Sequence, residues 1–541
     1  MMRRLFRFKG GVHPPQRKQM SNGRPIRAAQ LPEHLVLPVH QHIGESSAPI
    51  VQIGDHVLKG QKIARAQGYV SAALHAPSSG KVVAIEERPI PHPSGLSAEC
   101  IVIETDGEER WADVVPDDKP YTEMDASHLR NLIRGAGIVG LGGAGFPSYI
   151  KLNPAGAQID TLILNGVECE PYITCDDMLM RERPAEIIAG AKIMRHAVQA
   201  KQVVIAVEDN KPEAYAALQQ ACADEDIEVL QVPTLYPAGS EKQLIQVITG
   251  KECPSNGLPY QIGVVVHNVA TAAAVHRAID LGQPLISRIV TVTGDGVAEP
   301  ANLEVLFGTP MQALLDQCGG LSPDVDRVVM GGPMMGFAMP DTSVPVIKTT
   351  NCVLAAVKEN VTPPAEVLPC IRCGACADAC PVDLLPQQLQ WYARSQEFDR
   401  AQEYSLFDCI ECGCCAYVCP SNIPLVHYFR YAKTEIWAQE RDKEKADIAR
   451  QRHEFRLARL EREKAEKAAR LAKKKAAVKK PAEDGGKGDK QAEIQAALER
   501  AKAKKAVQAV PAKNTDNLTP AQQKQVEDAD ARRSADEKQQ G

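Results

Sequence analysis

Nine of the sixteen cysteines fall between Cys370 and Cys419. Eight of them follow one spacing twice: three cysteines with two residues between neighbours, a fourth cysteine four positions later, and then a proline. The first run ends at Pro381 and the second at Pro420. The other cysteines are scattered singly, which does not suit a disulfide framework. Two copies of one spacing therefore predict thiolate ligation of metal in a reducing compartment.

This spacing is that of bacterial two-cluster ferredoxins, in which three cysteines of one run and the fourth of the other hold each [4Fe-4S] cluster. Zinc is the weaker alternative, because zinc sites usually show paired Cys-x-x-Cys units. Cys414 falls outside the pattern, and we expect it to pack near a cluster rather than to ligate it. The ferredoxin pattern implies one cluster on Cys370, Cys373, Cys376 and Cys419, and a second on Cys380, Cys409, Cys412 and Cys415.

Charge divides the chain into an acidic body and a basic tail. Residues 441–541 carry 27 Lys and Arg against 18 Asp and Glu, although the whole chain has a net charge of -5. The tail, 436–541, contains one aromatic residue beyond Trp437 and is predicted to be a solvated helix or a disordered extension. Contact with anionic lipid or an acidic partner is the alternative. Aromatic residues are only 4% of the chain, so we expect no nucleic-acid partner.

The sequence has no apolar run near the 18 or so residues that are needed to span a bilayer. The stretch from Met1 to Lys9 carries charges and lacks the apolar core of a signal peptide. We therefore expect the chain to stay on the side of the membrane where it is made.

Residues 29–112 read as short strands broken by turns, which predicts a small all-β domain. Its Gly54-Asp55-His56-Val57 and Pro77-Ser78-Ser79-Gly80 segments resemble the barrel-sandwich fold of biotinyl and lipoyl carriers. Those carriers need a lysine at the hairpin tip, and no lysine lies between Gln67 and Gly80. We therefore expect a scaffold without a swinging arm.

The rest of the body predicts a multidomain α+β chain. Residues 120–285 alternate helical stretches with β-branched runs, which is typical of an α/β domain with a central sheet. Residues 286–350 return to strands and resemble the ubiquitin-like SLBB module, a β-grasp fold. A ferredoxin-type domain is expected over 365–435, and 1–28 is expected to be an N-terminal extension.

A glycine-rich segment from Gly140 to Pro147 is the second chemical signal. It satisfies the G-x-G-x-x-G pattern of dinucleotide-binding Rossmann loops. Such a loop follows a strand, whereas the apolar residues upstream, Leu129, Leu132 and Ile133, are spaced for a helix. The glycines still allow backbone N–H groups to approach a phosphate, so the loop is open to being a plain turn or a phosphate cradle.

Four segments in order resemble the flavin-carrying, NADH-binding subunit of respiratory complex I: Gly142–Pro147 with Lys151, Asn165–Pro171, Tyr236–Glu241 and Val266–Val269. The resemblance implies non-covalent FMN and NAD(H). It implies that FMN is contacted by Gly142, Gly143, Gly145, Lys151, Asn165 and Asn268, and that Glu168, Glu170, Tyr236 and Glu241 line the NADH side. Gly140 and Gly239 complete the implied cofactor-binding set.

The segments depart from the complex I pattern at Leu141, Val167, Ser240 and His267, where that family has Arg, Asp, Glu and Asn. Three of these changes remove a charge from a nucleotide site. They leave an alternative open, in which the chain is an electron conduit that uses only its clusters and has a vacant nucleotide site.

The order of all these parts, after a Phe8–Pro14 start, resembles the RnfC family of the Rnf (Rsx) ion-translocating oxidoreductase complexes. The family implies a peripheral subunit on the cytoplasmic side of the bacterial inner membrane. It implies an NADH-linked oxidoreductase that passes electrons between NAD(H) and ferredoxin-type carriers, coupled to ion translocation. The implied partners are membrane-embedded subunits and another iron–sulfur subunit. The related quinone-linked protein of the sodium-translocating NADH:quinone reductase is a weaker match, because we expect no double ferredoxin motif there.

Overall fold

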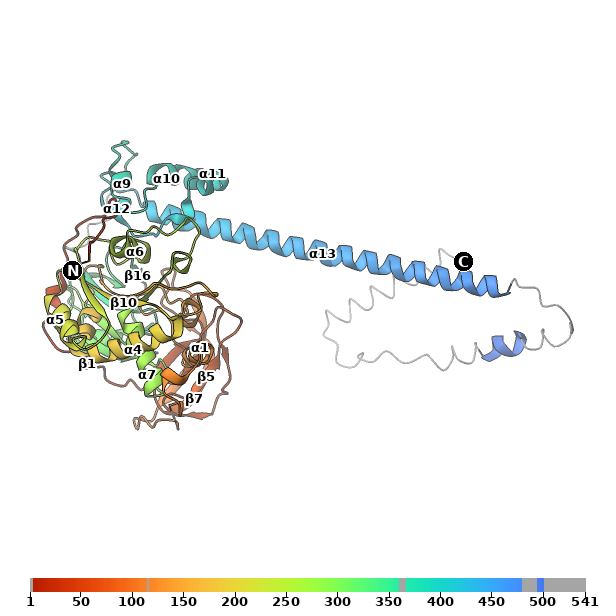
Figure 1. Cartoon of the computed structure of the whole chain (residues 1–541), viewed down its shortest axis with the longest axis horizontal. Helices are drawn as coiled ribbons and strands as arrows, with labels where there is room; N and C mark the ends of the chain where they lie inside the picture. The colour runs from red at the N-terminus through yellow and green to blue at the C-terminus, as the bar shows by residue number, and fades with distance from the viewer. Residues whose placement is uncertain (1–2, 114–115, 360–365, 479–493, 501–541) are drawn as a thin grey trace. The chain divides into compact units, whose positions relative to one another are not determined.

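The computed structural model describes residues 3–113, 116–359, 366–478 and 494–500 (Figure 1). The chain divides into two compact units, Met1–Arg441 and Asp442–Gly541. None of the helices in the described ranges is long and apolar enough to cross a membrane. The short helical turns of the first unit are η1 (Lys18–Met20), η2 (Tyr121–Glu123), α2 (Ser148–Lys151), η3 (Pro259–Ile262) and η4 (Leu406–Asp408).

The first domain is built from two small antiparallel sheets. One has the order β2-β8-β7-β4, and the other has the order β3-β5-β6. Every residue from Ser71 to Gly80 is buried, so the segment that corresponds to a carrier's hairpin tip is packed inside the protein. This burial agrees with a scaffold role. The strands are β2 (His34–Pro38), β3 (Ala48–Pro49), β4 (His56–Val57), β5 (Lys62–Arg65), β6 (Leu74–His75), β7 (Gly80–Pro89) and β8 (Ser97–Thr105).

The second domain has a four-stranded parallel sheet with the order β11-β10-β9-β12. Its inner strands are almost entirely apolar, because a parallel sheet is covered on both faces. Leu162 and Leu164 pack with one core cluster, whereas Ile163 packs with another, as the alternation of a strand requires. The strands are β9 (Thr161–Gly166), β10 (Gln202–Glu208), β11 (Glu228–Val232) and β12 (Val264–Asn268).

Helices cover both faces of this sheet. The apolar faces of α4 and α7 share one core with Leu162 and Leu164, while α6 packs on the other side with the N-terminal residue Phe8. A Cβ at Gly190 of α4 would lie 1.8 Å from the Ala272 carbonyl of α7, so the closeness of these helices requires glycine there. The helices are α1 (Ala126–Gly135), α3 (Cys175–Glu182), α4 (Pro184–Val198), α5 (Pro212–Ala221), α6 (Glu241–Thr249) and α7 (Val269–Asp280).

A six-stranded mixed sheet follows, with the order β1-β14-β13-β17-β15-β16. It draws one edge strand from the predicted N-terminal extension and one inner strand from beyond residue 350, so it extends past both ends of the 286–350 segment. The elements are β1 (Arg27–Ala28), β13 (Ser287–Thr293), β14 (Ala301–Leu306), α8 (Met311–Gln317), β15 (Val325–Met330), β16 (Phe337–Met339) and β17 (Cys352–Val357).

The cysteine-rich region contains two short helices, α9 (Ala375–Asp378) and α12 (Cys414–Tyr417), one in each run. Two more helices, α10 (Pro386–Ser395) and α11 (Phe398–Glu403), lie between the runs in sequence. The long helix α13 (Leu425–Val478) begins within the predicted ferredoxin-type domain, because its first turns are apolar and pack in the cysteine-region core. Residues 494–500 of the tail are also helical.

The buried imidazole of His42 gives the first domain a pH-dependent stability. Its Nε2 accepts from the Ala72 N–H at 3.0 Å, and its Nδ1 lies 3.0 Å from the Ile43 carbonyl. Burial lowers the pKa of His42 from 6.5 to about 4, and the Lys348 and His40 charges act in the same direction. The imidazole of His42 is therefore neutral in the folded protein at neutral pH.

We predict that the free energy of unfolding falls as the pH is lowered from 6.5 toward 4. In this window the unfolded chain binds a proton at His42 that the folded chain excludes, which changes stability by at most about 1.4 kcal/mol per pH unit. The measurement is the midpoint of urea unfolding between pH 7 and 4.5. A His42→Gln variant should show a shallower pH dependence, and an unchanged slope would contradict this role.

Candidate cofactor sites

The parallel sheet has a topological switch point between β9 and β12. The chain runs from β9 to β10 and β11 on one side, and then returns to place β12 on the other side of β9. Asn165 and Asn268 are paired in register at the carboxyl ends of these two strands. Ligands of open α/β sheets bind at this place, because the connections leave in opposite directions and open a crevice. Two of the predicted cofactor residues therefore stand where the topology favours a ligand.

The glycine-rich loop closes over the same strand end. It follows α1 rather than a strand, as expected, and its ends are joined by the Gly140 N–H, which donates to the Phe146 carbonyl at 2.8 Å. A Cβ at Gly142 would lie 3.4 Å from the Asn268 Cβ, which brings the loop against the switch point. The loop is thus not a Rossmann turn, although it lies at a ligand-binding position of the sheet.

Gly143 has a backbone conformation and open surroundings that suit close approach of a phosphate. Its φ is +111°, and the one atom within 4 Å of a Cβ built there is the Asn351 amide nitrogen, at 3.9 Å. Gly142 and Gly143 are exposed, whereas a Cβ at Gly145 would lie 2.5 Å from the Thr349 side chain. The backbone can therefore approach a bound group at Gly143 in a way that a side chain would obstruct.

Polar side chains from neighbouring elements border this strand end. Lys151 of α2 forms an ion pair with Glu241, the first residue of α6, at 2.9 Å. The Asn165 amide donates to the Gly239 carbonyl at 2.8 Å, so the turn before α6 is fixed to β9. Asn268 caps α7 with its side-chain oxygen and donates to Asp176 at 2.6 Å. The structure brings together Gly140, Gly142, Gly143, Gly145, Lys151, Asn165, Gly239, Glu241 and Asn268 in this way.

His267 belongs to the same strand end and was missed as a candidate residue. It is 3% exposed, and its Nε2 is buried without a hydrogen-bond partner among the described residues. Burial lowers its pKa well below 6.5, and the Lys151 charge lowers it further, so the imidazole is neutral. Its departure from the asparagine of the complex I pattern was visible in the sequence, but the unpaired nitrogen was not. An orphaned polar atom beside Lys151 fits a site that holds a polar group.

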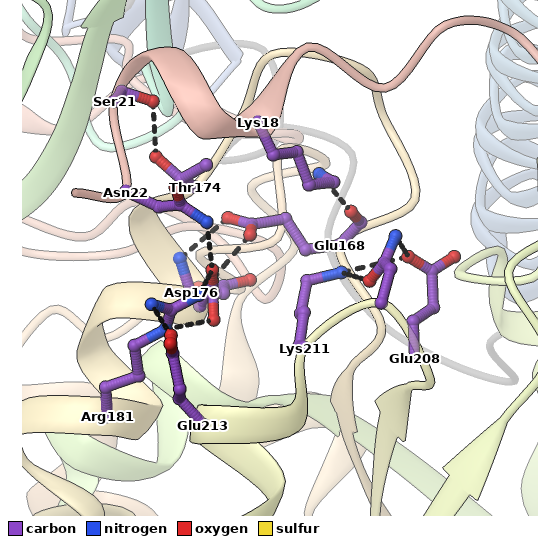
Figure 2. A network of polar contacts seen from close by, with 12 residues as sticks. Lys18, Ser21, Asn22, Glu168, Thr174, Asp176, Arg181, Glu208, Lys211 and Glu213 are labelled. Carbon is purple, nitrogen blue, oxygen red and sulfur yellow. Dashed lines mark hydrogen bonds and ion pairs between the residues drawn. The ribbon is translucent and has the colours of Figure 1, made fainter.

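Glu168 is half-buried, and its carboxylate lies at the N-terminus of α3 (Figure 2). Its carboxylate accepts from the N–H groups of Asp176 at 2.7 Å and Asp177 at 3.2 Å, which satisfies two orphan donors of that helix. Burial raises the pKa of Glu168 to about 8, and the Lys18 ammonium opposes this shift. Its φ of +47° is rare for a residue with a side chain and is held by these contacts.

Lys18 precedes the second domain in sequence, and it anchors the segment of that domain that carries Glu168. Its ammonium donates to the backbone carbonyl of Glu168 at 2.8 Å (Figure 2). It also donates to the carbonyls of Glu170 at 3.0 Å and Ile173 at 2.7 Å. The side chain is 6% exposed although it comes from the predicted N-terminal extension. The extension is therefore an integral part of the fold, and a lone lysine between polar residues gave no sequence signal for this role.

Glu170 and Tyr236, which are predicted to line the nicotinamide side, each have polar partners within the chain. Glu170 accepts from the Met334 and Met335 N–H groups at 2.7 and 3.1 Å, so its carboxylate fixes the loop between β15 and β16. Tyr236 is 1% exposed, and its hydroxyl donates to the Cys412 carbonyl at 2.7 Å. The loop between β15 and β16 thus bonds to Glu170, and the cysteine region bonds to Tyr236.

Two of the departures from the complex I pattern are also explained by packing. Leu141 is 3% exposed and Val167 is fully buried, each in a hydrophobic core cluster. Here these positions contribute apolar surface to the core rather than charge to the strand end. The Arg288 guanidinium donates to the Leu141 carbonyl at 2.9 Å, so the loop still has a buried cation beside it.

The predicted cysteine sets converge on two separate cavities. The first, of about 310 Å³, is lined by Cys370, Cys373, Cys376 and Cys419. A second, smaller cavity is lined by Cys380, Cys409, Cys412 and Cys415. Three thiols of one run meet the last thiol of the other in both cases, which is the donor set that a [4Fe-4S] cluster takes. The residues present therefore fit two such clusters.

The two runs repeat their backbone geometry as well as their spacing. Arg372 and Glu411 are left-handed with φ of 58° and 57°, and Gly374 and Gly413 both have φ of 83°. Each glycine precedes one of the short helices α9 and α12. Cys414 is fully buried beside Tyr236 and does not line either cavity. Its placement agrees with a packing role.

Four family profiles match successive parts of the chain. They are the RnfC barrel sandwich hybrid domain at residues 6–108, the Nuo51 FMN-binding domain at 133–277, the SLBB domain at 289–338 and the 4Fe-4S dicluster domain at 369–423. These matches confirm the predicted multidomain fold class and the expectation of FMN-binding and iron–sulfur domains.

Curated relatives match over nearly the whole chain. The RnfC-type member of the ion-translocating oxidoreductase complex of Serratia proteamaculans is 47% identical over 507 residues, which are 94% of this chain and 71% of the relative. The chain belongs to the RnfC family of ion-translocating oxidoreductase complexes. The Vibrio cholerae member is 47% identical over 93% of this chain, and the Pseudomonas aeruginosa member is 50% identical over 86%. This chain spans only 65% and 60% of those two members.

Replacing Lys18 tests the importance of the N-terminal segment for the RnfC fold. Lys18→Met removes the donor of three buried carbonyls, and we expect a loss of about 2–4 kcal/mol in the free energy of unfolding. Lys9→Met is the matched control, because the Lys9–Asp383 pair is mostly exposed and such pairs contribute little. The measurement is urea unfolding followed by circular dichroism. Equal midpoints for the two variants would contradict the anchoring role.

Adjacent cysteines test the ligand sets. We expect Cys415→Ala to lose about half of the bound iron after anaerobic reconstitution, because it removes one thiolate of a four-thiolate set. Cys414→Ala should keep the wild-type iron content, since its sulfur faces Tyr236 rather than either cavity. The measurement is iron and acid-labile sulfide per chain. Loss of iron from Cys414→Ala, or none from Cys415→Ala, would reject the assignment.

Proposed function

We propose that the chain is the electron-transfer subunit of an ion-translocating oxidoreductase complex. It exchanges electrons with NAD(H) at the switch point of its parallel sheet, where FMN binds, and passes them through two [4Fe-4S] clusters. The complex couples this transfer, between NAD(H) and ferredoxin-type carriers, to ion translocation. The protein binds peripherally at the cytoplasmic side of the bacterial inner membrane, against membrane-embedded subunits and another iron–sulfur subunit.

One contact carries this proposal: the bond from the Tyr236 hydroxyl to the Cys412 carbonyl. Tyr236 belongs to the loop that leads into α6, and the same loop is fixed to β9 through Asn165 and Gly239. Cys412 belongs to one of the two cysteine sets. A nucleotide-type fold and a cluster-type loop thus share a buried hydrogen bond, which keeps their cofactors at a fixed separation.

The residues at the strand end have distinct roles in this proposal. Gly142 and Gly143 let the backbone approach a phosphate, and Lys151 supplies a positive charge beside it. Asn165 and Asn268 fix the turn before α6 and the first turn of α7 at the strand end, and the neutral His267 offers its unpaired Nε2. Glu241 holds Lys151 in place. A bound flavin accepts the two electrons of a hydride and releases them singly, which suits clusters that carry one electron each.

The protein only has to bind the clusters and set their reduction potentials. Eight thiolates in two sets bind them, and the nearby backbone donors, such as the Leu384 N–H that donates to Cys380 Sγ at 3.3 Å, influence their potentials. The proposed electron transfer requires no general acid, general base or nucleophile from the chain.

A conduit that uses only the clusters is the competing function, based on the lost charges at Leu141, Val167 and Ser240. The burial of Leu141 and Val167 in the core weakens it, because these two side chains would not face a nucleotide at the strand end. The two functions differ in one simple observable, which is whether FMN binds.

A substitution at Gly143 tests whether FMN binds at this loop. Gly143→Ala places a methyl group in the open space of the loop, and we expect FMN affinity to fall at least about tenfold through steric exclusion and the strain of φ +111°. Gly54→Ala is the matched control, because Gly54 has φ +101° and equally open surroundings in the first domain. Equilibrium titration with FMN, followed by flavin fluorescence, is the measurement. Equal affinities in the two variants would reject the site, and no FMN binding by the wild type would favour the conduit.

A further inference from the structure

The two cysteine runs are equivalent in sequence and backbone, but their surroundings differ. The Cys409 run is packed against the second domain and the loop between β15 and β16. A Cβ at Gly413 would lie 2.8 Å from the Met334 carbonyl, whereas nothing described lies within 4 Å of a Cβ at the equivalent Gly374. Cys412 is 7% exposed, and its equivalent Cys373 is exposed. The same surface is therefore covered in one run and bare in the other.

The charged residue at the third position of each run shows the same contrast. Glu411 pairs with Arg430 at 2.9 Å and with Lys433 at 2.8 Å, both from α13, so its charge is neutralised within the chain. Arg372, at the equivalent position, makes no ion pair with any described residue and lies over the Trp391 ring at 5.5 Å. Within the described part of the chain, it is the one Arg, Lys, Asp or Glu that lines the first cysteine cavity. Arg372 thus carries a positive charge at the cavity that no ion pair among the described residues neutralises.

The apolar residues of the two runs also differ in exposure. Ile410 is half-buried against a core that includes Val12 and Tyr236, whereas the equivalent Ile371 is 66% exposed. Trp391, which is 37% exposed, borders the same cavity. An exposed isoleucine beside an Arg–Trp pair is the composition of a binding hot spot. We name Ile371, Arg372, Cys373, Gly374 and Trp391 the outer face.

We propose that the outer face is the docking site for a one-electron carrier protein with an acidic surface around its redox centre. The partner covers the outer face as the second domain covers the equivalent surface of the Cys409 run. The Cys380–Cys409–Cys412–Cys415 set is then the inner relay, next to the nucleotide-binding fold, and the Cys370–Cys373–Cys376–Cys419 set is the outer relay, next to the partner. This inference rests on the two clusters of the proposed function, but not on FMN or NADH.

Charge favours an acidic partner over a basic one. Arg372 lines the cavity and is held by Trp391 with its charge unneutralised by any described residue. Complementary charge raises the rate of encounter and aligns the two redox centres, and this effect weakens with salt. Electron-transfer encounters also use small interfaces, for which a patch of five residues is a suitable centre.

The test measures second-order electron-transfer rates with two protein probes of opposite charge. The full-length, iron-reconstituted chain is oxidised and mixed in a stopped-flow instrument with a reduced acidic two-cluster ferredoxin. In a second series, the chain is first reduced with dithionite, freed of excess reductant and mixed with oxidised, basic cytochrome c. Neither series uses NADH, so a failure of the nucleotide site does not affect the result.

Arg372→Glu should lower the rate with the acidic ferredoxin about tenfold at low ionic strength and raise the rate with cytochrome c. Arg65→Glu is the matched control, since it makes the same charge change at an exposed residue of β5 and should alter both rates less than about twofold. Ile371→Ser leaves the charge intact and should lower the ferredoxin rate through lost apolar contact. Iron content and the EPR spectra of both outer-face variants must match the wild type.

Equal rates for Arg372→Glu and Arg65→Glu with both probes would overturn the proposal. So would a ferredoxin rate that falls in Arg372→Glu but is independent of salt, because docking by charge requires screening. If Arg372→Glu loses iron, Ile371→Ser becomes the deciding variant, and a wild-type ferredoxin rate in that variant would also overturn the proposal.

Discussion

The joint between the parallel-sheet domain and the cysteine region is the constraint on which the rest of the structure depends. Val12 exchanges two backbone hydrogen bonds with Tyr236, at 2.8 and 3.0 Å, and the Gly11 N–H donates to the Ala379 carbonyl at 3.0 Å. A Cβ at Gly10 would lie 2.7 Å from the Ala379 backbone. The N-terminal segment therefore lies between the two regions and is bonded to both. Electron transfer depends steeply on distance, so a joint made of buried hydrogen bonds serves the function directly.

The sequence predicted the elements whose signal is local. The helix α1 before the glycine-rich loop agrees with the helical spacing of Leu129, Leu132 and Ile133, and the parallel sheet agrees with the β-branched runs of residues 120–285. The eight predicted ligand cysteines line two cavities in the two sets that the ferredoxin pattern implies. Gly142, Lys151, Asn165 and Asn268 come from the segments that carry the resemblance to complex I, and all four lie at the strand end.

Other features depended on contacts between distant segments and had no local signal. The buried Lys18 appears in sequence as an ordinary basic residue, and its three carbonyl partners lie about 150 positions away. Glu170 and Tyr236 match a nucleotide-binding pattern, yet here the loop between β15 and β16 and the cysteine region occupy their polar atoms. The unpaired Nε2 of His267 and the unneutralised charge of Arg372 are likewise visible only when the neighbours of each side chain are known.

The central claim is that one chain joins a nucleotide-binding flavin site to two clusters. The most direct measurement is an anaerobic NADH titration of the iron- and FMN-reconstituted chain, followed by optical and EPR spectroscopy. The account predicts bleaching of the flavin absorbance and then EPR signals from both clusters. Clusters that respond to dithionite but not to NADH would contradict it, and would mean that electrons enter this chain from another protein.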